Sequence, residues 1–261
     1  MKKTNFYARI ALGLIIFALL EVSAARAQTA ADKMRIRQAM MPNNEGVKQF
    51  TTEKYQAAIE LFDQAIRLNP NNAAAYYNLG TAHYRLWQFE KAVGAFGQAV
   101  KLNPAYAEAF NQLGVVYTET AQYEKAVEVL KQAIRLKNNN PIALYNLGCV
   151  YIRQKKFKEA IEPLRQAAQL DENNVEIRLN LGYAYSREKL FSQALAEMRK
   201  AVSISPDDEQ AQLSLGNLYL LTNDRQAAIE QYAAMKTANP QLAEKIYQAI
   251  YNGRIVTVLN K

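Results

Sequence analysis

The sequence predicts an all-α protein: a right-handed superhelical solenoid of six stacked helix-turn-helix repeats, followed by a C-terminal capping helix. Three observations support this prediction. Six of the ten glycines are spaced by 34 residues, and a period of this length is typical of repeat architectures. An alanine follows each of these glycines after 12 residues, and a large apolar residue follows the alanine after four more. The six glycines are Gly46, Gly80, Gly114, Gly148, Gly182 and Gly216.

Residues 1–27 have the composition of a secretory signal peptide. Basic residues near the start precede an uncharged apolar run over residues 10–20, and the small residues Ala25 and Ala27 are typical of a cleavage site. The run is about half of the ~20 residues that a membrane-spanning helix needs. We therefore expect a mature chain that begins at Gln28, is exported to the periplasm or secreted, and has no stable membrane span. The alternative is an N-terminal helix that stays on the protein as an anchor.

The rest of the chain divides into a short leading segment, the repeats and a cap. Residues 28–38 are expected to be a flexible segment. Pro42 and the two asparagines after it should cut the first helix of the first repeat short. Beyond the last repeat, residues 243–261 are expected to form a capping helix and a tail. The six repeats are 39–72, 73–106, 107–140, 141–174, 175–208 and 209–242.

Each repeat is expected to form a pair of antiparallel helices. In the third repeat, a helix over about residues 108–120 places Phe110, Leu113, Gly114 and Tyr117 on one stripe, at the spacing of an amphipathic helix. A second helix follows over about residues 124–137. Small residues let the two backbones approach closely, and bulky residues between them fill the remaining space. One such hairpin has too little core to fold alone, so neighbouring repeats must stack on it.

The recurring residues resemble the tetratricopeptide repeat (TPR) family, whose signature places a large residue, Leu-Gly, Tyr, Ala, Phe, Ala and Pro at these spacings. The segments 76–80 and 144–148, which read Tyr-Tyr-Asn-Leu-Gly and Leu-Tyr-Asn-Leu-Gly, carry the resemblance most clearly. Together with residues 1–27, it identifies the chain as an exported bacterial member. The resemblance implies that the first helices line the concave side of the superhelix and that extended peptides bind there.

The composition excludes several classes of function. One cysteine and one histidine exclude a disulfide framework, a cysteine-based zinc site and a multi-histidine metal site. His83 stands where later repeats have tyrosine and Cys149 directly follows a repeat glycine, so both are expected to be packing residues. For the cysteine, a mixed disulfide is the alternative. We predict that the protein is not an enzyme and has no catalytic residue, metal or cofactor.

The charge balance gives no support for nucleic-acid binding. The formal net charge of +8 would fall to +5 without the four basic residues and one acidic residue of segment 1–27. The bases and acids that remain are interleaved, whereas a nucleic-acid interface needs a one-sided basic face. We expect a protein or peptide partner, and no nucleic acid.

The candidate site is a peptide-binding groove on the first helices, where positions 2, 5, 6, 9, 12 and 13 of each repeat form one stripe. Asparagine recurs at position 6, and its carboxamide can pair with the backbone of a bound strand. Tyrosines supply rigid, half-polar contact area, and arginines can pair with carboxylates. The predicted groove residues are Tyr77, Asn78, Thr81, Tyr84, Arg85, Asn111, Gln112, Tyr145, Asn146, Arg153, Asn180, Tyr183, Arg187 and Asn217.

Two alternatives stay open at this level. The asparagines would brace neighbouring helices instead of a ligand, and the tyrosines would fill the space between repeats. Trp87, at a turn where the family often has glycine, is a second contact candidate.

The expected function is a non-enzymatic interaction scaffold of the bacterial envelope that captures an extended partner segment. The alternative is a structural subunit of an envelope assembly for secretion, pili or polysaccharide export, which packs by its convex face or its ends.

The sequence also gives an expectation for two groove residues. If the groove captures the partner, replacing both Asn146 and Arg153 by alanine should abolish capture, whereas under the structural alternative capture should stay intact. The stability expectation depends on these two side chains being solvated. Each replacement should then change stability by no more than about 0.5 kcal/mol.

Overall fold

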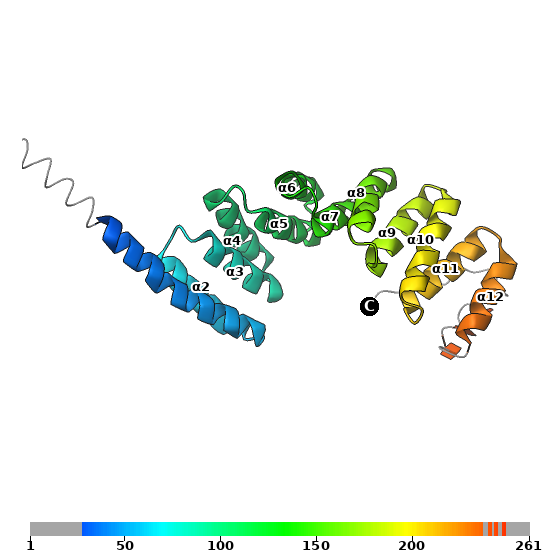
Figure 1. The fold of residues 1–261 in the computed structure, drawn as a ribbon, viewed down its shortest axis with the longest axis horizontal. Coiled ribbons are helices and arrows are strands. Elements are labelled where there is room, and N and C mark those ends of the chain that lie inside the picture. The colour runs from blue at the N-terminus through cyan, green and yellow to red at the C-terminus, as the bar shows by residue number, and fades with distance from the viewer. Residues whose placement is uncertain (1–27, 237–239, 242, 245–246, 249–261) are drawn as a thin grey trace, which may run out of the picture. The chain divides into compact units, whose positions relative to one another are not determined.

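The computed structural model describes residues 28–236, 240–241, 243–244 and 247–248, and the regular secondary structure of this part is helical (Figure 1). The predicted signal peptide, most of the predicted capping helix and the whole tail lie outside the described residues. Among the described residues, a helix over 28–51 comes first. It is followed by α2 (Tyr55–Leu68), α3 (Ala73–Arg85), α4 (Phe89–Leu102), α5 (Ala107–Glu119), α6 (Tyr123–Leu136), α7 (Pro141–Arg153), α8 (Phe157–Leu170), α9 (Val175–Arg187), α10 (Phe191–Ile204), α11 (Glu209–Leu221) and α12 (Arg225–Met235).

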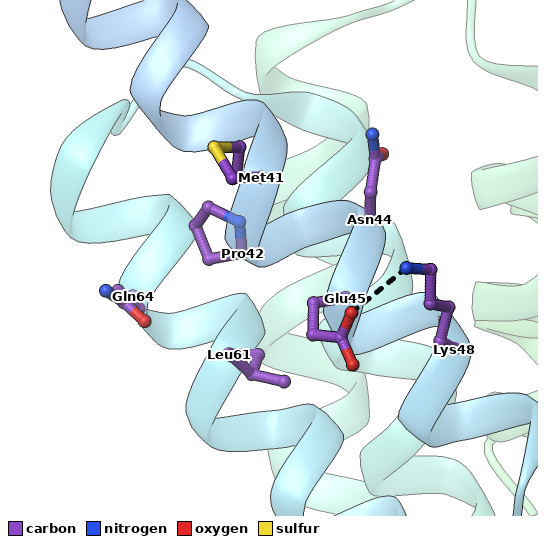
Figure 2. A pocket seen from close by; sticks show the side chains of 7 residues that line it. All are labelled: Met41, Pro42, Asn44, Glu45, Lys48, Leu61 and Gln64. Atoms are coloured by element: carbon purple, nitrogen blue, oxygen red, sulfur yellow. Dashed lines mark hydrogen bonds and ion pairs between the residues drawn. The ribbon is translucent and has the colours of Figure 1, made fainter.

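The start of the chain differs from the expectation. Residues 28–38 are helical and exposed, and the helix continues through Pro42 to residue 51. Proline removes one backbone donor, but here its ring is buried. Figure 2 shows Met41 and Pro42 beside Leu61 and Gln64 of α2, where they line a cavity of about 450 Å³. Packing against α2 therefore lets the helix continue through Pro42, where the sequence alone predicted a break.

The chain divides into two compact units, Met1–Pro104 and Ala105–Lys261. In the first unit, α3 packs against both α2 and α4. In the second unit, α5 pairs with α6, α7 with α8, α9 with α10 and α11 with α12, and each pair packs against the next. Each of these pairs is a helix-turn-helix unit, and successive pairs follow one another at the 34-residue period of the sequence.

Side-chain caps fix where several first helices begin. Asn72, Asn140, Asn174 and Asp208 each accept a hydrogen bond from a backbone N–H of the first turn that follows. Such caps satisfy donors that have no partner inside the helix, and they typically contribute about 1 kcal/mol each. These four residues stand directly before α3, α7, α9 and α11, at the same place in their repeats.

A close approach of backbone and side chain joins the two helices of a repeat. A Cβ added to Gly114 would lie 2.5 Å from Cγ of Leu130, which is too short for two carbon atoms. In other repeats, the glycine at the equivalent position lies against Phe62, Phe96, Leu164 or Met198. Since Leu130 and its counterparts are buried, the second helix fills the notch that the glycine leaves on the first helix.

The turn between the two helices of each repeat contains one residue with positive φ. These residues are Glu53, Trp87, Ala121, Lys155, Lys189 and Asn223, with φ between 56° and 60°. They recur every 34 residues, and none is glycine. Trp87 is 76% exposed in its turn. Its ring meets that of Phe89 edge-on, with centroids 5.8 Å apart.

In the second unit, the first helices of successive repeats form a continuous row. Helix α5 contacts α7, α7 contacts α9, and α9 contacts α11. Among the described helices of this unit, the second helices α6, α8, α10 and α12 do not approach one another. The first helices therefore lie on the inner side of this unit, as the resemblance to TPR proteins implied.

A buried ion pair fixes α9 against α10. The Arg178 guanidinium donates to the Glu197 carboxylate at 2.7 Å and to the Glu172 carbonyl at 2.8 Å. Both charged side chains are nearly buried, at 9% and 14% exposure. Removing one partner of such a pair usually costs about 3–5 kcal/mol, because the other charge is left unpaired.

The close approach at Gly114 can be tested by adding one methyl group. Gly114→Ala should lower the free energy of unfolding by about 1–3 kcal/mol, because Leu130 has no room to yield without repacking. Gly94→Ala is the matched control: Gly94 lies inside α4, and nothing lies within 4 Å of an added Cβ. It should raise stability by about 0.5–1 kcal/mol through helix propensity. Urea unfolding of both variants measures this, and a Gly114→Ala protein as stable as wild type would contradict the packing described.

Candidate functional site

A cleft of about 820 Å³ lies along α9 and α11 on the inner row of helices. It extends from the first turns of these two helices, where Glu176 and Gln210 lie, to their last turns, where Arg187 and Leu221 lie. Ile152 of α7 and Met198 of α10 complete its wall. The remaining lining residues are Leu179, Asn180, Tyr183, Ser186, Ser214, Asn217 and Leu218.

The cleft brings together four of the predicted groove residues: Asn180, Tyr183, Arg187 and Asn217. Gln112 and Asn111 lie on α5, and Tyr145, Asn146 and Arg153 on α7, in the same row of helices but outside the lining of the cleft. The other predicted residues, Tyr77, Asn78, Thr81, Tyr84 and Arg85, lie on α3 in the unit Met1–Pro104.

Sequence reasoning missed part of the cleft, although the signal was present. Several lining residues occupy positions 2, 5, 6, 12 or 13 of the fifth and sixth repeats, which belong to the predicted stripe. These residues are Glu176, Leu179, Ser186, Gln210, Ser214 and Leu221. Leu218, Ile152 and Met198 could not be inferred in this way, because their contribution depends on how neighbouring helices pack.

The asparagines at position 6 connect neighbouring first helices. Asn146 donates to the Asn111 side chain at 2.9 Å, and Asn78 donates to Asn43 at 3.1 Å. Asn180 donates to the Tyr145 hydroxyl at 3.3 Å. In each case the acceptor is position 5 of the preceding repeat. These asparagines therefore brace successive repeats, which was the alternative to a ligand contact.

This bracing corrects the expectation for the pair Asn146 and Arg153. Asn146 is half-buried and bonded to the preceding repeat, so its side chain is not simply solvated. Arg153 forms an ion pair with Glu119 at 3.2 Å. Replacing both residues by alanine would remove two contacts between repeats, so a loss of partner capture by that variant could not be assigned to the groove alone.

Arg187 differs from Arg153 in its surroundings. It has no carboxylate partner within the described part of the chain. Its guanidinium carbon lies 4.3 Å from the centroid of the Phe157 ring, and Nη1 donates to the Tyr183 hydroxyl at 2.8 Å. The Tyr183 ring in turn meets Phe157 edge-on, with centroids 5.8 Å apart. A cation held on an aromatic face in this way keeps its charge available to a ligand.

Close to the cleft, on α7, burial governs the chemistry of two groups. The Tyr145 hydroxyl donates to the Glu176 carboxylate at 2.7 Å. Burial, together with the neighbouring Cys149 thiol and Glu176, raises the pKa of Tyr145. Burial also raises the pKa of the Cys149 thiol to about 11, although a hydrogen bond with Tyr145 opposes this shift. At neutral pH both groups are protonated, so neither is an activated nucleophile.

His83 is buried, as predicted, on α3. Its Nδ1 lies 2.8 Å from Oε1 of Gln88, and burial lowers its pKa, so the ring is neutral at pH 7. Within the described residues, no group of three His, Cys, Asp or Glu side chains could hold a metal ion. None of the helices in this described part is both long and apolar enough to span a membrane.

Stacked helix pairs, an inner row of first helices and a half-polar cleft along that row define an interaction solenoid of the TPR class. A family model described as the C-terminal domain of cilia and flagella-associated protein 70 matches residues 17–249, so the chain belongs to this family of TPR domains. Proteins of this class are scaffolds, and the protein is non-enzymatic. Among curated proteins, none matches the sequence.

Solved structures show the same fold. YrrB, described as a TPR protein with an unusual peptide-binding site, is 25% identical, with 72% of this chain and 97% of YrrB covered and a TM-score of 0.61. TTC0263 of Thermus thermophilus, described as a thermophilic TPR protein, is 26% identical, with 70% and 99% covered and a TM-score of 0.53. PilF of Pseudomonas aeruginosa is 19% identical, with 85% and 99% covered and a TM-score of 0.66, which shows the fold alone.

The raised pKa of Cys149 predicts a slow thiol. At pH 8, the folded protein should react with iodoacetamide about tenfold or more slowly than the protein unfolded in guanidinium chloride, because little thiolate is present. Cys149 is the only cysteine, so the alkylated mass reports on it alone. Equal rates in the two states would show that the thiol is accessible and ionised in the folded protein.

Proposed function

We propose that this protein is a scaffold that captures an extended segment of a partner protein in the cleft between α9 and α11. The observation that supports the proposal is the cleft itself, which combines an apolar wall with hydrogen-bonding groups spaced along two neighbouring helices. Apolar contact area gives affinity, and a few placed polar groups give orientation. YrrB is described as having a peptide-binding site, and a peptide is the ligand that a cleft of this composition would accept here.

The dimensions of the cleft fit a short peptide. Glu176 and Arg187 are 11 residues apart on one helix, which corresponds to about 17 Å at the helical rise per residue. An extended strand covers this distance with about five residues. The volume of about 820 Å³ lies in the range of ordinary ligand sites. Asn180 lies near the middle of this path. Its Nδ2 donates to Tyr145 and to the Glu176 carbonyl, and its Oδ1 can accept a hydrogen bond from the backbone of the strand.

A matched pair of substitutions tests this proposal. Ser214 lines the cleft on α11, and Ser214→Trp should fill it and lower the amount of captured partner about tenfold or more. Ser203→Trp on α10 is the control, because Ser203 is exposed and lies outside the cleft lining. The measurement is affinity capture from the native cell extract with quantitative mass spectrometry, after circular dichroism has shown that both variants are helical.

The alternative, a structural subunit that packs by its convex face or ends, predicts a different result. Ser214→Trp would then retain the same partners as wild type. A photo-crosslinking residue at Gln210, in the cleft, would give no product, whereas one at Gln169, exposed on α8, would. This outcome would overturn capture in the cleft.

We also propose that the protein acts outside the cytoplasm, in the bacterial envelope or beyond it. The basic start, the apolar run over residues 10–20 and the small residues at Ala25 and Ala27 support this location. The family description names cilia and flagella, but a repeat architecture serves many unrelated partners and places. Intact mass measurement of the protein from its native cell should give a chain that begins at Gln28. A chain that retains residues 1–27 would contradict cleavage.

A further inference from the structure

We propose that the α9–α11 cleft selects a peptide in which a single carboxylate, bound by Arg187, stands next to one or two large apolar side chains. This inference rests on the proposed function, since it names the chemistry of the ligand that the same cleft would capture. The carboxylate has two possible sources, an aspartate or glutamate side chain and a peptide C-terminus, and both present the same group to the guanidinium.

The first argument is the position of Arg187 in the repeat register. Position 13 of successive repeats carries Glu119, Arg153, Arg187 and Leu221. Arg153 pairs with Glu119 in the preceding repeat at 3.2 Å. For Arg187, the preceding position is another arginine and the following one is leucine. Arg187 therefore has no acidic residue at position 13 of the neighbouring repeats, unlike Arg153, which pairs with Glu119.

The second argument is that Arg187 is already held in place. The Phe157 ring lies under its guanidinium at 4.3 Å, and the Tyr183 hydroxyl accepts from Nη1 at 2.8 Å. This side chain consequently loses little conformational freedom when a ligand binds. A guanidinium has five N–H donors in a planar fork, so most remain for a carboxylate, which it binds in bidentate geometry.

The third argument is the apolar surface around this cation. Leu221 is 47% exposed and Tyr183 is 40% exposed, and both line the cleft beside Arg187. Leu179 and Leu218 continue the apolar wall along α9 and α11. A ligand that offered only a carboxylate would leave this surface in water, whereas an adjacent large apolar side chain would cover it.

The opposite end of the cleft restricts the ligand to one carboxylate. Glu176 is exposed there and accepts a hydrogen bond from Tyr145. A second carboxylate of the ligand near Glu176 would be repelled, while a backbone N–H or a basic side chain would be favoured. The charges of Glu176 and Arg187 thus orient the peptide along the cleft, with its anionic end at the last turn of α9.

The experiment is a selection from random seven-residue peptides on the full-length protein, in two formats. One format has amidated C-termini and the other has free C-termini. Wild-type protein should enrich peptides with one Asp or Glu beside Leu, Ile, Met or Phe. If the carboxylate is a C-terminus, this acidic enrichment should be confined to the amidated format, and the free format should enrich apolar residues at the last two positions.

Variants of two arginines at the same register position make the test specific. Arg187→Gln should weaken binding of the enriched peptides about tenfold or more, measured by fluorescence anisotropy, because a charge-assisted hydrogen-bond pair is lost. Arg153→Gln is the matched control and should leave affinity unchanged, since that charge is already paired with Glu119. Raising the salt concentration should weaken wild-type binding more than the binding that remains in Arg187→Gln.

The outcomes separate this inference from the proposed function. If Ser214→Trp abolishes binding but the enriched peptides carry no carboxylate, the cleft is the site and the assignment of ligand chemistry is wrong. Equal affinity of wild type and Arg187→Gln for acidic peptides would also overturn it. If Ser214→Trp binds the same peptides as wild type, the cleft is not the site, and the proposed function fails together with this inference.

Discussion

The close approach of the two helices within the first five repeats is the constraint on which the rest of the structure depends. A glycine on the first helix lies directly against a large apolar side chain of the second, as Gly114 does against Leu130. This contact sets how closely the two helices of a pair approach each other. Repeats contact only their neighbours, so pairs with the same internal geometry stack on one another in a similar way. The inner row of α5, α7, α9 and α11 results from this repetition.

The side-chain contacts between neighbouring helices differ from one repeat to the next. Asparagine at position 6 reaches position 5 of the preceding repeat in three places, but the acceptor is an asparagine twice and a tyrosine once. Arg178 adds a buried ion pair between α9 and α10. The cleft lies beside this firmly fixed pair of helices, which suits a site that must hold several groups at set distances.

The fold could be predicted from the sequence because one period encodes both the helices and their packing. The candidate site could be predicted only in part. The stripe of six positions placed Asn180, Tyr183, Arg187 and Asn217 on one surface, and they do line the cleft. The partners of Asn146 and Arg153 could not be predicted, because they depend on rotamers and on distances between helices. The helix through Pro42 was missed for a similar reason, since tertiary packing outweighs the local preference of proline.

The left-handed residue in each turn has a consequence for how much stability the protein can still gain. A residue with a Cβ in this conformation costs roughly 1–2 kcal/mol compared with the right-handed helical region, and asparagine costs less. Five of the six turns carry such a residue other than asparagine, Trp87 among them. Replacing these five residues by glycine or asparagine would therefore raise the free energy of unfolding, and none of them lines the cleft. The packing of the repeats offsets this strain in the turns, so the identity of the turn residue can vary from repeat to repeat.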